Sequence, residues 1–215
     1  MKTKIHTVYK TQDGIRVPGV TTILSSILSK PALIYWAWDL GCQGIDYRKY
    51  RDDKADIGTL NHEMELCHLK GEKVDTSDYT EKQIDLAETC FLKYLEWESQ
   101  HKLDPILLEK PLVSEKYKYG GTLDFYGKID GILTLLDFKT GKAIYPEHFY
   151  QLAGYRNLLI ENRYKPARYI ILRLGRDETE GFEVIEVKKL KFETKVFLKC
   201  AEIYHLQNEI KNKNN

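Results

Sequence analysis

The first hundred residues carry their apolar side chains at helical spacing, three or four positions apart. This spacing predicts amphipathic helices, and several of their ends carry residues suited to capping. Thr80, with Gln83 three positions later, is typical of a capping box, and Gly71 is typical of a helix end. Ahead of the helices, alternation over 4–10 and 15–17, interrupted by a Gln-Asp-Gly turn, predicts a small hairpin. The predicted helices cover residues 21–28 (capped by Thr21 or Thr22), 31–40 (with Pro31 in the first turn), 55–70 and 80–101.

From residue 106 onward the pattern changes to short apolar runs, which indicate strands. Gly120-Gly121 and Asp130-Gly131 supply turns between the first three runs, so these runs predict an antiparallel meander. Two further helices are predicted, over 146–162 and over 193–210. The order of elements predicts a mixed α/β fold with a hairpin and helices in front of it. The predicted strands cover residues 106–113, 122–127, 132–138, 167–174 and 182–187.

The composition is that of a soluble chain with one sizeable core, since 42% of the 215 residues are hydrophobic and 30% are charged. The four cysteines are far apart and form no Cys-x-x-Cys pair, which argues against a disulfide scaffold or a zinc site and favours a reducing cytoplasm. The sequence shows neither a signal peptide nor a membrane-spanning run. The net charge of +1 is only a weak argument for nucleic-acid binding, so local charge matters more.

Two acidic residues fall on predicted neighbouring strands. Asp124 follows Gly-Thr-Leu, and Asp137 begins the triplet Asp137-Phe138-Lys139. Alternate side chains of a strand share a face, so Asp137 and Lys139 point the same way while Phe138 faces the opposite side. Two carboxylates, with the backbone carbonyl of Phe138 as a further hard oxygen, suit Mg²⁺ or Mn²⁺. Lys139 is then placed to orient a water molecule or to stabilise negative charge on a phosphate.

A surface ion pair on an edge strand is the alternative interpretation of Asp137 and Lys139. The run in front of them, Ile132-Leu-Thr-Leu-Leu, is apolar enough to be buried. A buried charged pair calls for a reason, so we favour a functional pair. On the following helix, Gln151 and Tyr155 share a face because they are four residues apart. We expect them to bond a phosphate or to hold Lys139, with packing against the sheet as the alternative for Tyr155.

Four segments together resemble the motifs of the PD-(D/E)XK nuclease superfamily, and in particular its RecB-like exonuclease branch. The resemblance implies a restriction-endonuclease-like core of order αβββαβ, with a central mixed sheet between helices. It also implies one nuclease domain with an N-terminal hairpin and helical extension (1–54), a core (55–174) and a C-terminal strand and helix (175–215). In chain order the four segments are Gly58-Thr-Leu-Asn-His62, Gly121-Thr-Leu-Asp124, Asp137-Phe-Lys139 and Gln151-Leu-Ala-Gly-Tyr155.

The resemblance implies that His62 binds the metal from a helix, beside Asp124, Asp137 and the Phe138 carbonyl. Gly58, one turn earlier, would let that helix approach another backbone closely. A half-buried helix histidine is the alternative, and imidazole suits Mn²⁺ better than Mg²⁺. Glu63 and Glu65 are interpreted as solvated helix charges, and Glu109 either as a further acidic site residue or as a solvated strand charge. The implied catalytic residues are Asp124, Asp137, Lys139, Gln151 and Tyr155.

Basic residues near these motifs are the expected contacts to DNA phosphates. They are Lys116, Lys118, Lys142 and His148. A second lysine cluster, between residues 188 and 199, is more typical of a solvated face. Tyr35, Trp36 and Trp38 lie on one predicted helix. Such an aromatic helix is more often part of a core, and stacking on unpaired bases is the alternative.

Three features that related nucleases can have are missing from this sequence. Leu123 stands where the family often has proline before the first acid, which leaves the assignment standing. Only Cys200 lies in the C-terminal third, so no four-cysteine iron–sulfur cluster is expected. The sequence has no Walker A pattern, so no built-in ATP-driven helicase is expected.

The sequence thus predicts a Mg²⁺- or Mn²⁺-dependent deoxyribonuclease of the cytoplasm, or of a host cell if the chain is phage-encoded. The Gln-xxx-Tyr motif resembles the end-processing branch, so an exonuclease acting on single- or double-stranded DNA with free ends is favoured. Recombination, repair or phage DNA processing is the implied setting, with no membrane partner. The alternatives are a structure-specific endonuclease or junction resolvase, and a non-catalytic DNA-binding subunit. Intact Asp124, Asp137 and Lys139 favour an enzyme.

Overall fold

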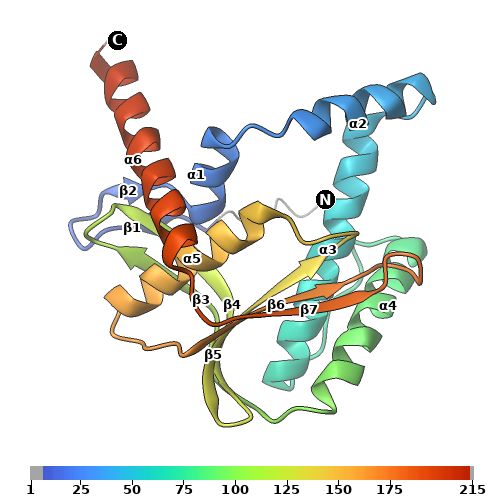
Figure 1. Cartoon of the computed structure of the whole chain (residues 1–215). Coiled ribbons are helices and arrows are strands. Elements are labelled where there is room, and N and C mark those ends of the chain that lie inside the picture. Colours follow the sequence, from blue (N-terminus) through green and yellow to red (C-terminus); the bar gives the residue numbers. More distant parts are fainter. Residues whose placement is uncertain (1–6, 214–215) are drawn as a thin grey trace.

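A five-stranded mixed sheet forms the centre of the computed structural model, which describes residues 7–213 (Figure 1). The first three strands form an antiparallel meander, and α5 (Pro146–Glu161) then crosses to a strand parallel to the third. The last strand is antiparallel to its neighbour. The predicted mixed α/β fold with core order αβββαβ is therefore confirmed. Across the sheet the strands are β3 (Leu103–Ser114), β4 (Tyr119–Ile129), β5 (Ile132–Thr140), β6 (Arg168–Leu174) and β7 (Phe182–Val187).

Helices cover both faces of the sheet (Figure 1). On one face α1 (Val20–Ile27), α5 and α6 (Lys191–Lys213) share a buried apolar cluster with the strands. On the other face α4 (Glu81–Glu98) packs on the strands, and α3 (Tyr47–Lys70) packs on α4 and β5. Because β5 and β6 are covered on both sides, each has a buried apolar run at its middle, Leu135-Leu136 in β5 and Ile170-Ile171-Leu172 in β6. In the described part of the chain, no helix has the length and apolar character to cross a membrane.

The capping residues of α3 and α4 account for their ends. Thr80 and Gln83 form the predicted capping box at the start of α4. Gly71, with a φ of 69°, ends α3 as predicted. However, α3 begins eight residues earlier than predicted, after Asp46, whose side chain accepts a hydrogen bond from the Arg48 amide at 2.9 Å. Its first two turns are mostly charged, so they carry no apolar periodicity. The cap predicted for α1 is wrong, because that helix begins after Gly19 without a side-chain cap.

The prediction of a turn at Gly120-Gly121 is also wrong, because both glycines lie inside β4. The chain reverses just before them, over residues 115–118, where the Lys118 amide donates to the Ser114 carbonyl at 3.0 Å. The glycines leave room for neighbours. A Cβ at Gly120 would overlap the ring of Tyr9, and a Cβ at Gly121 would lie 2.8 Å from Cε1 of Tyr155. By contrast, the turn predicted at Asp130-Gly131 is confirmed, and both residues have the positive φ of a tight hairpin.

The N-terminal hairpin packs on the central sheet. Its strands are β1 (Tyr9–Lys10) and β2 (Arg16–Val17), which confirms the predicted hairpin there, while positions 4–6 lie outside the described residues. The Tyr9 hydroxyl is 2.9 Å from Oγ1 of Thr122, and the Gly120 amide donates to the Pro18 carbonyl at 2.9 Å. The hairpin is thus fixed to β4 two residues before Asp124.

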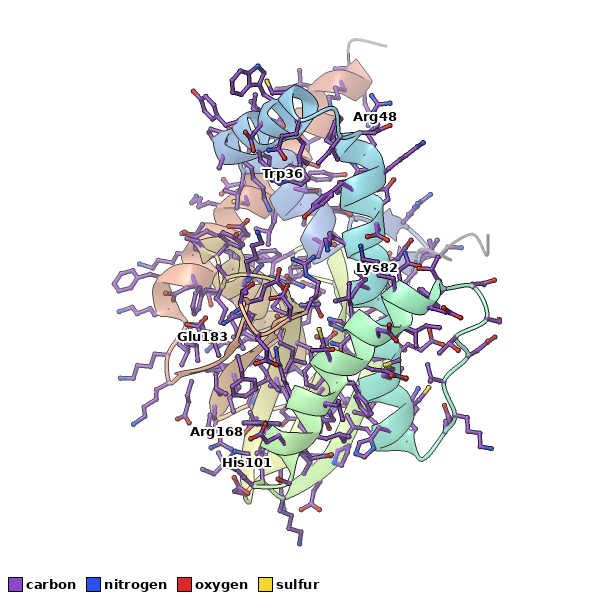
Figure 2. All side chains as sticks on the ribbon, turned by 90° about the vertical axis from the view of Figure 1, so that its right-hand side faces the viewer. Trp36, Arg48, Lys82, His101, Arg168 and Glu183 are labelled. Atoms are coloured by element: carbon purple, nitrogen blue, oxygen red, sulfur yellow. The ribbon has the colours of Figure 1, made fainter. Side chains whose placement is uncertain are left out.

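The aromatic helix α2 (Pro31–Cys42) projects away from the sheet at the upper right of Figure 1. Pro31 opens it as predicted. Tyr35 and Trp38 are 74% and 69% exposed, so the core interpretation is wrong for both. Trp36, labelled on this helix in Figure 2, is half-buried. Its ring meets the ring of Tyr50 edge-on, with 5.9 Å between centroids.

Candidate active site

The candidate site lies where two neighbouring strands separate. The pairing of β4 with β5 ends at Phe125 and Leu136. Beyond that point β4 continues with β3, and β5 continues with β6. Asp124 and Asp137 are the first residues past the last pair, and Oδ2 of Asp124 accepts a hydrogen bond from the Phe138 amide at 2.9 Å. We call this point of separation between β4 and β5 the fork. At the fork, the carboxylate of Asp124 takes the place of a backbone acceptor for the Phe138 amide.

Strand β4 is irregular at Asp124. Leu123 packs in the cluster beneath α5, whereas Phe125 packs in the cluster beneath α4. Residues two apart would share a face in a regular strand, so the alternation breaks between them. On β3, Glu109 lies between the pairs that Leu108 and Lys110 make with β4, and it has a φ of 45°. A positive φ is uncommon for a residue with a side chain and is often found at functional sites.

Asp137 and Lys139 form a close ion pair at the fork. Nζ of Lys139 lies 2.5 Å from Oδ2 of Asp137 and donates to the Phe138 carbonyl at 3.2 Å. Asp137 is only 1% exposed and lies on a central strand, so the alternative of a surface pair on an edge strand is wrong. The ion pair lacks hydrogen-bond geometry, and neither oxygen of Asp137 accepts a hydrogen bond from the described residues.

Burial dominates the electrostatics of the two carboxylates. It raises the pKa of Asp137 to about 6, and the charge of Asp124 acts in the same direction, against the opposing effect of Lys139. Burial also raises the pKa of Asp124, while Lys139 and the Phe138 amide lower it. For both carboxylates, burial therefore outweighs the nearby positive charge and hydrogen bonds that favour the ionised form. An additional cation at the fork would stabilise the ionised form of both carboxylates.

The residues at the fork fit a hard divalent cation. Among residues 7–213, no three His, Cys, Asp or Glu side chains converge closely enough to form a metal site alone. Mg²⁺, however, is commonly held by one or two carboxylates together with water and substrate phosphate. Asp124, Asp137 and the Phe138 carbonyl offer such a set of hard oxygens, and both oxygens of Asp137 lack hydrogen-bond donors within the described part of the chain.

The structure brings His62 to this fork. Nδ1 of His62 lies 3.8 Å from Oδ1 of Asp124, and its ring meets the ring of Phe138 edge-on at 6.0 Å. Burial, followed by the charge of Lys139, lowers the pKa of His62 to about 4. The imidazole is therefore neutral at pH 7, the form that binds metals. Gly58 faces Thr140, but an added Cβ would lie 3.6 Å from Cβ of Thr140, which is ordinary contact, so glycine is not required there.

The interpretation of Glu65 as a solvated charge is wrong, because its side chain is 0% exposed. The Asn61 amide donates to Oε1 of Glu65 at 2.8 Å and to Oγ1 of Thr140 at 3.2 Å. Burial, followed by the charge of Asp124, raises the pKa of Glu65 well above its usual range. The helical pattern contained the signal, since the buried positions of α3 recur every three or four residues. They are Ile57, Leu60, Asn61, Met64 and Glu65.

Gln151 and Tyr155 meet as predicted from their spacing. Nε2 of Gln151 donates to the Tyr155 hydroxyl at 2.8 Å. Tyr155 is 6% exposed, and burial together with the charges of Asp137 and Asp124 raises its pKa well above its usual range. The hydroxyl thus keeps its proton beside the carboxylates. The hydrogen bonds of the described residues include none from this pair to Lys139, so that part of the expectation stays a prediction.

The residues predicted to contact DNA lie on two sides of the fork. His148 is half-buried, and burial and the charge of Lys139 lower its pKa to about 4. Lys142 is exposed on the loop between β5 and α5. On the other side, Lys116 and Lys118 belong to the turn between β3 and β4. Glu109 is exposed and lines a cavity of about 30 Å³ together with His62 and Asp124.

Comparison with known proteins gives matches among solved structures alone. No protein-family model and no curated protein sequence matches this chain. A candidate exonuclease from Eubacterium rectale is similar with a TM-score of 0.48 and 14% identity, over 87% of this chain and 70% of that one. An alkaline exonuclease from Laribacter hongkongensis is similar with a TM-score of 0.38 and 10% identity, over 90% and 93%. Its complex with dAMP gives a TM-score of 0.39 and 11% identity, over 91% and 94%.

Proposed function

We propose that this protein is a divalent-metal-dependent deoxyribonuclease that hydrolyses phosphodiester bonds from DNA ends. One observation carries the proposal: Asp137 is buried at a fork in the sheet beside Asp124, with the Lys139 ammonium against it. Among the described residues, no group makes a hydrogen bond of good geometry to either oxygen of Asp137. Such a carboxylate is costly to bury and serves no evident packing role. A group of two carboxylates and one ammonium suits the binding of a cation and the phosphate that it attracts.

Each side chain at the fork has a role that follows from its contacts. When bound, a divalent cation supplies Lewis-acid polarisation of the phosphate and lowers the pKa of water. Asp124 and Asp137 would hold the cation together with the Phe138 carbonyl and the neutral imidazole of His62. Lys139 stabilises the negative charge that develops on the phosphate, and orients the water that attacks it.

The Gln151–Tyr155 pair borders the carboxylates from α5. Its protonated phenol is a hydrogen-bond donor that suits a phosphate oxygen. Lys142 and His148 on one side, and Lys116 and Lys118 on the other, bind the neighbouring phosphates of the substrate. These contacts position the strand, and they require no particular base sequence.

We further propose that the whole chain is one nuclease domain. In this proposal the core spans residues 55–174, and the segments 1–54 and 175–215 are extensions of it, whose described parts begin at residue 7 and end at residue 213. Contacts from both segments support this, since Tyr9 packs on Gly120 of β4 and Phe197 of α6 packs in the central cluster beneath α5.

Action from ends rather than at internal sites is supported by the resemblance of Gln151 and Tyr155 to the end-processing branch. The experiment is digestion of end-labelled linear DNA beside closed circular DNA of the same sequence, with Mg²⁺ or Mn²⁺. We expect linear DNA to be degraded and the circle to remain intact. Excess chelator should stop the reaction. Equal rates on the circle would show an endonuclease, and undiminished cleavage in chelator would rule out metal dependence.

The contribution of His62 can be separated from that of the carboxylates. Removing it opens one coordination position without removing a charge, so His62→Ala should weaken Mn²⁺ binding, whereas Asp124→Ala should abolish it. Calorimetric titration with Mn²⁺ beside a melting curve checks this. Unchanged Mn²⁺ affinity with a lowered melting temperature would show that His62 only packs against Phe138.

A further inference from the structure

An open furrow leads from the candidate active site across the molecule toward α6. It consists of two hollows of about 1020 Å³ and about 970 Å³. The first contains Tyr155 and Glu109 of the site, and the two hollows share Lys118, His205 and Asn208. Pockets for small ligands measure about 300–1,000 Å³ each, so the joined hollows exceed what one small molecule fills. We call the two hollows together the furrow.

The hairpin, α1 and α6 build the walls of the first hollow. Arg16 of β2 is exposed on its rim, and Thr21 and Thr22 line it from the first turn of α1. Thr122 lines it from β4, two residues before Asp124. Tyr204 lines it from α6. The hollow therefore offers a guanidinium, several hydroxyls and an aromatic ring directly beside the site.

Two lysine clusters that are far apart in the sequence meet across the second hollow. Lys116 and Lys118 come from the turn between β3 and β4, and Lys195 and Lys199 come from α6. Glu202 and Glu209 also line this hollow, and Glu202 pairs with Lys199 at 2.7 Å. Glu115 also pairs with Lys118 at 3.4 Å, so four lysines against three glutamates leave a net positive charge on this surface. The lysine cluster between residues 188 and 199 was interpreted from the sequence as a solvated face. Two of its members, Lys195 and Lys199, share this positive surface with Lys116 and Lys118.

We propose that the furrow holds an unpaired strand of nucleic acid that extends from the phosphate bound at the fork. This rests on the proposed function and specifies the form of its substrate. A positive groove with aromatic rings along it is the arrangement that binds single strands without sequence preference. Tyr117 and Tyr204 supply the rings, and the ammonium of Lys116 lies 5.0 Å from the ring centre of Tyr117.

The test is a binding measurement in excess chelator, where a metal-dependent nuclease leaves the probes intact. Fluorescence anisotropy is recorded with a labelled 20-nucleotide single strand and with the blunt duplex of the same sequence. The variant is Arg16→Ala with Lys195→Ala, which removes one charge from each hollow. Both side chains are exposed, so the fold should be preserved. The control is Lys73→Ala with Lys82→Ala, the same charge change at exposed positions of the α3–α4 loop and of α4. Figure 2 shows Lys82 on α4, the helix that packs on the face of the sheet opposite to α1, α5 and α6.

We expect the furrow variant to bind the single strand on the order of tenfold more weakly than the native protein. The slope of log affinity against log salt concentration should become shallower by about 1.4, because two phosphate contacts are lost and each contributes about 0.7 on single strands. Affinity for the duplex should change less, and the control should bind like the native protein. Equal losses on both probes, losses equal to those of the control, or unchanged binding would overturn the proposal.

Hydrolysis of linear DNA by the native protein with Mn²⁺ is measured separately. If DNA is degraded and the furrow variant binds normally, the proposed function stands and the furrow proposal fails. If the variant loses single-strand binding and the native protein degrades nothing, the furrow proposal stands and the nuclease proposal fails.

Discussion

Replacing Asp137 with asparagine is expected to abolish phosphodiester hydrolysis and to raise the melting temperature of the metal-free protein at pH 8. The first effect follows because asparagine supplies no anionic ligand for a hard cation. The second follows because the buried carboxylate is destabilising when it is ionised without a cation. Its pKa is raised from 3.8 to about 6, which corresponds to at most about 3 kcal/mol. Several degrees of melting temperature are expected for a domain of this size.

The raised pKa of Asp137 also determines how the stability of the metal-free protein changes with pH. A carboxyl group with a raised pKa binds its proton more tightly in the folded than in the unfolded state. Stability of the metal-free native protein should therefore fall as pH rises from about 4 to about 6, through the contribution of Asp137. Asp137→Asn should lack this contribution, so the two proteins should differ most above pH 6 and least near pH 4. Exposed Asp85→Asn on α4 is the control and should leave melting and activity unchanged.

Removing the ammonium of Lys139 should have the next largest effect. Lys139→Ala is expected to lower the rate about 10²–10³-fold, as when one electrostatic contact to a transition state is lost. The charge of Lys139 also lowers the pKa of Asp137, so its loss should raise that pKa above its present value of about 6. The acid limb of the pH–rate profile should therefore move to higher pH. Steady-state rates across pH 5–9 measure both effects.

Lys139→Arg is the matched comparison, because it keeps the charge and alters its geometry. It should leave the acid limb near its native position even if its rate is reduced. Near-normal turnover by a folded Lys139→Ala protein, with an unmoved acid limb, would show that the pair with Asp137 has no part in the reaction.

Local patterns were sufficient to predict most of the fold. Helical spacing in the first half and short apolar runs in the second gave the order of elements, and the capping box at Thr80 placed the start of α4. The failures have tertiary causes. Gly120-Gly121 has the composition of a turn, but the two residues are glycine because Tyr9 and Tyr155 pack against them. The start of α3 depends on a polar cap and charged turns, which have no apolar pattern.

The candidate site was predictable to the level of its residues, though not of its geometry. Residue types and spacing indicated Asp124, Asp137 and Lys139, and the structure brings them together. The fork between β4 and β5 and the irregularity of β4 depend on pairing between strands, which no single segment encodes. Glu65 was missed because a charged residue was taken for a solvated one, although its helical position is on the buried face.

The most direct test of the central claim is restoration of activity by metal. Protein treated with chelator and dialysed would receive Mn²⁺ in steps, with heat of binding and hydrolysis of end-labelled linear DNA followed in the same samples. We expect hydrolysis to rise in proportion to the bound metal in the native protein, and neither strong binding nor hydrolysis in Asp137→Asn. Hydrolysis by the native protein before any metal is added, or equal hydrolysis by Asp137→Asn, would contradict a metal-dependent nuclease centred on Asp124 and Asp137.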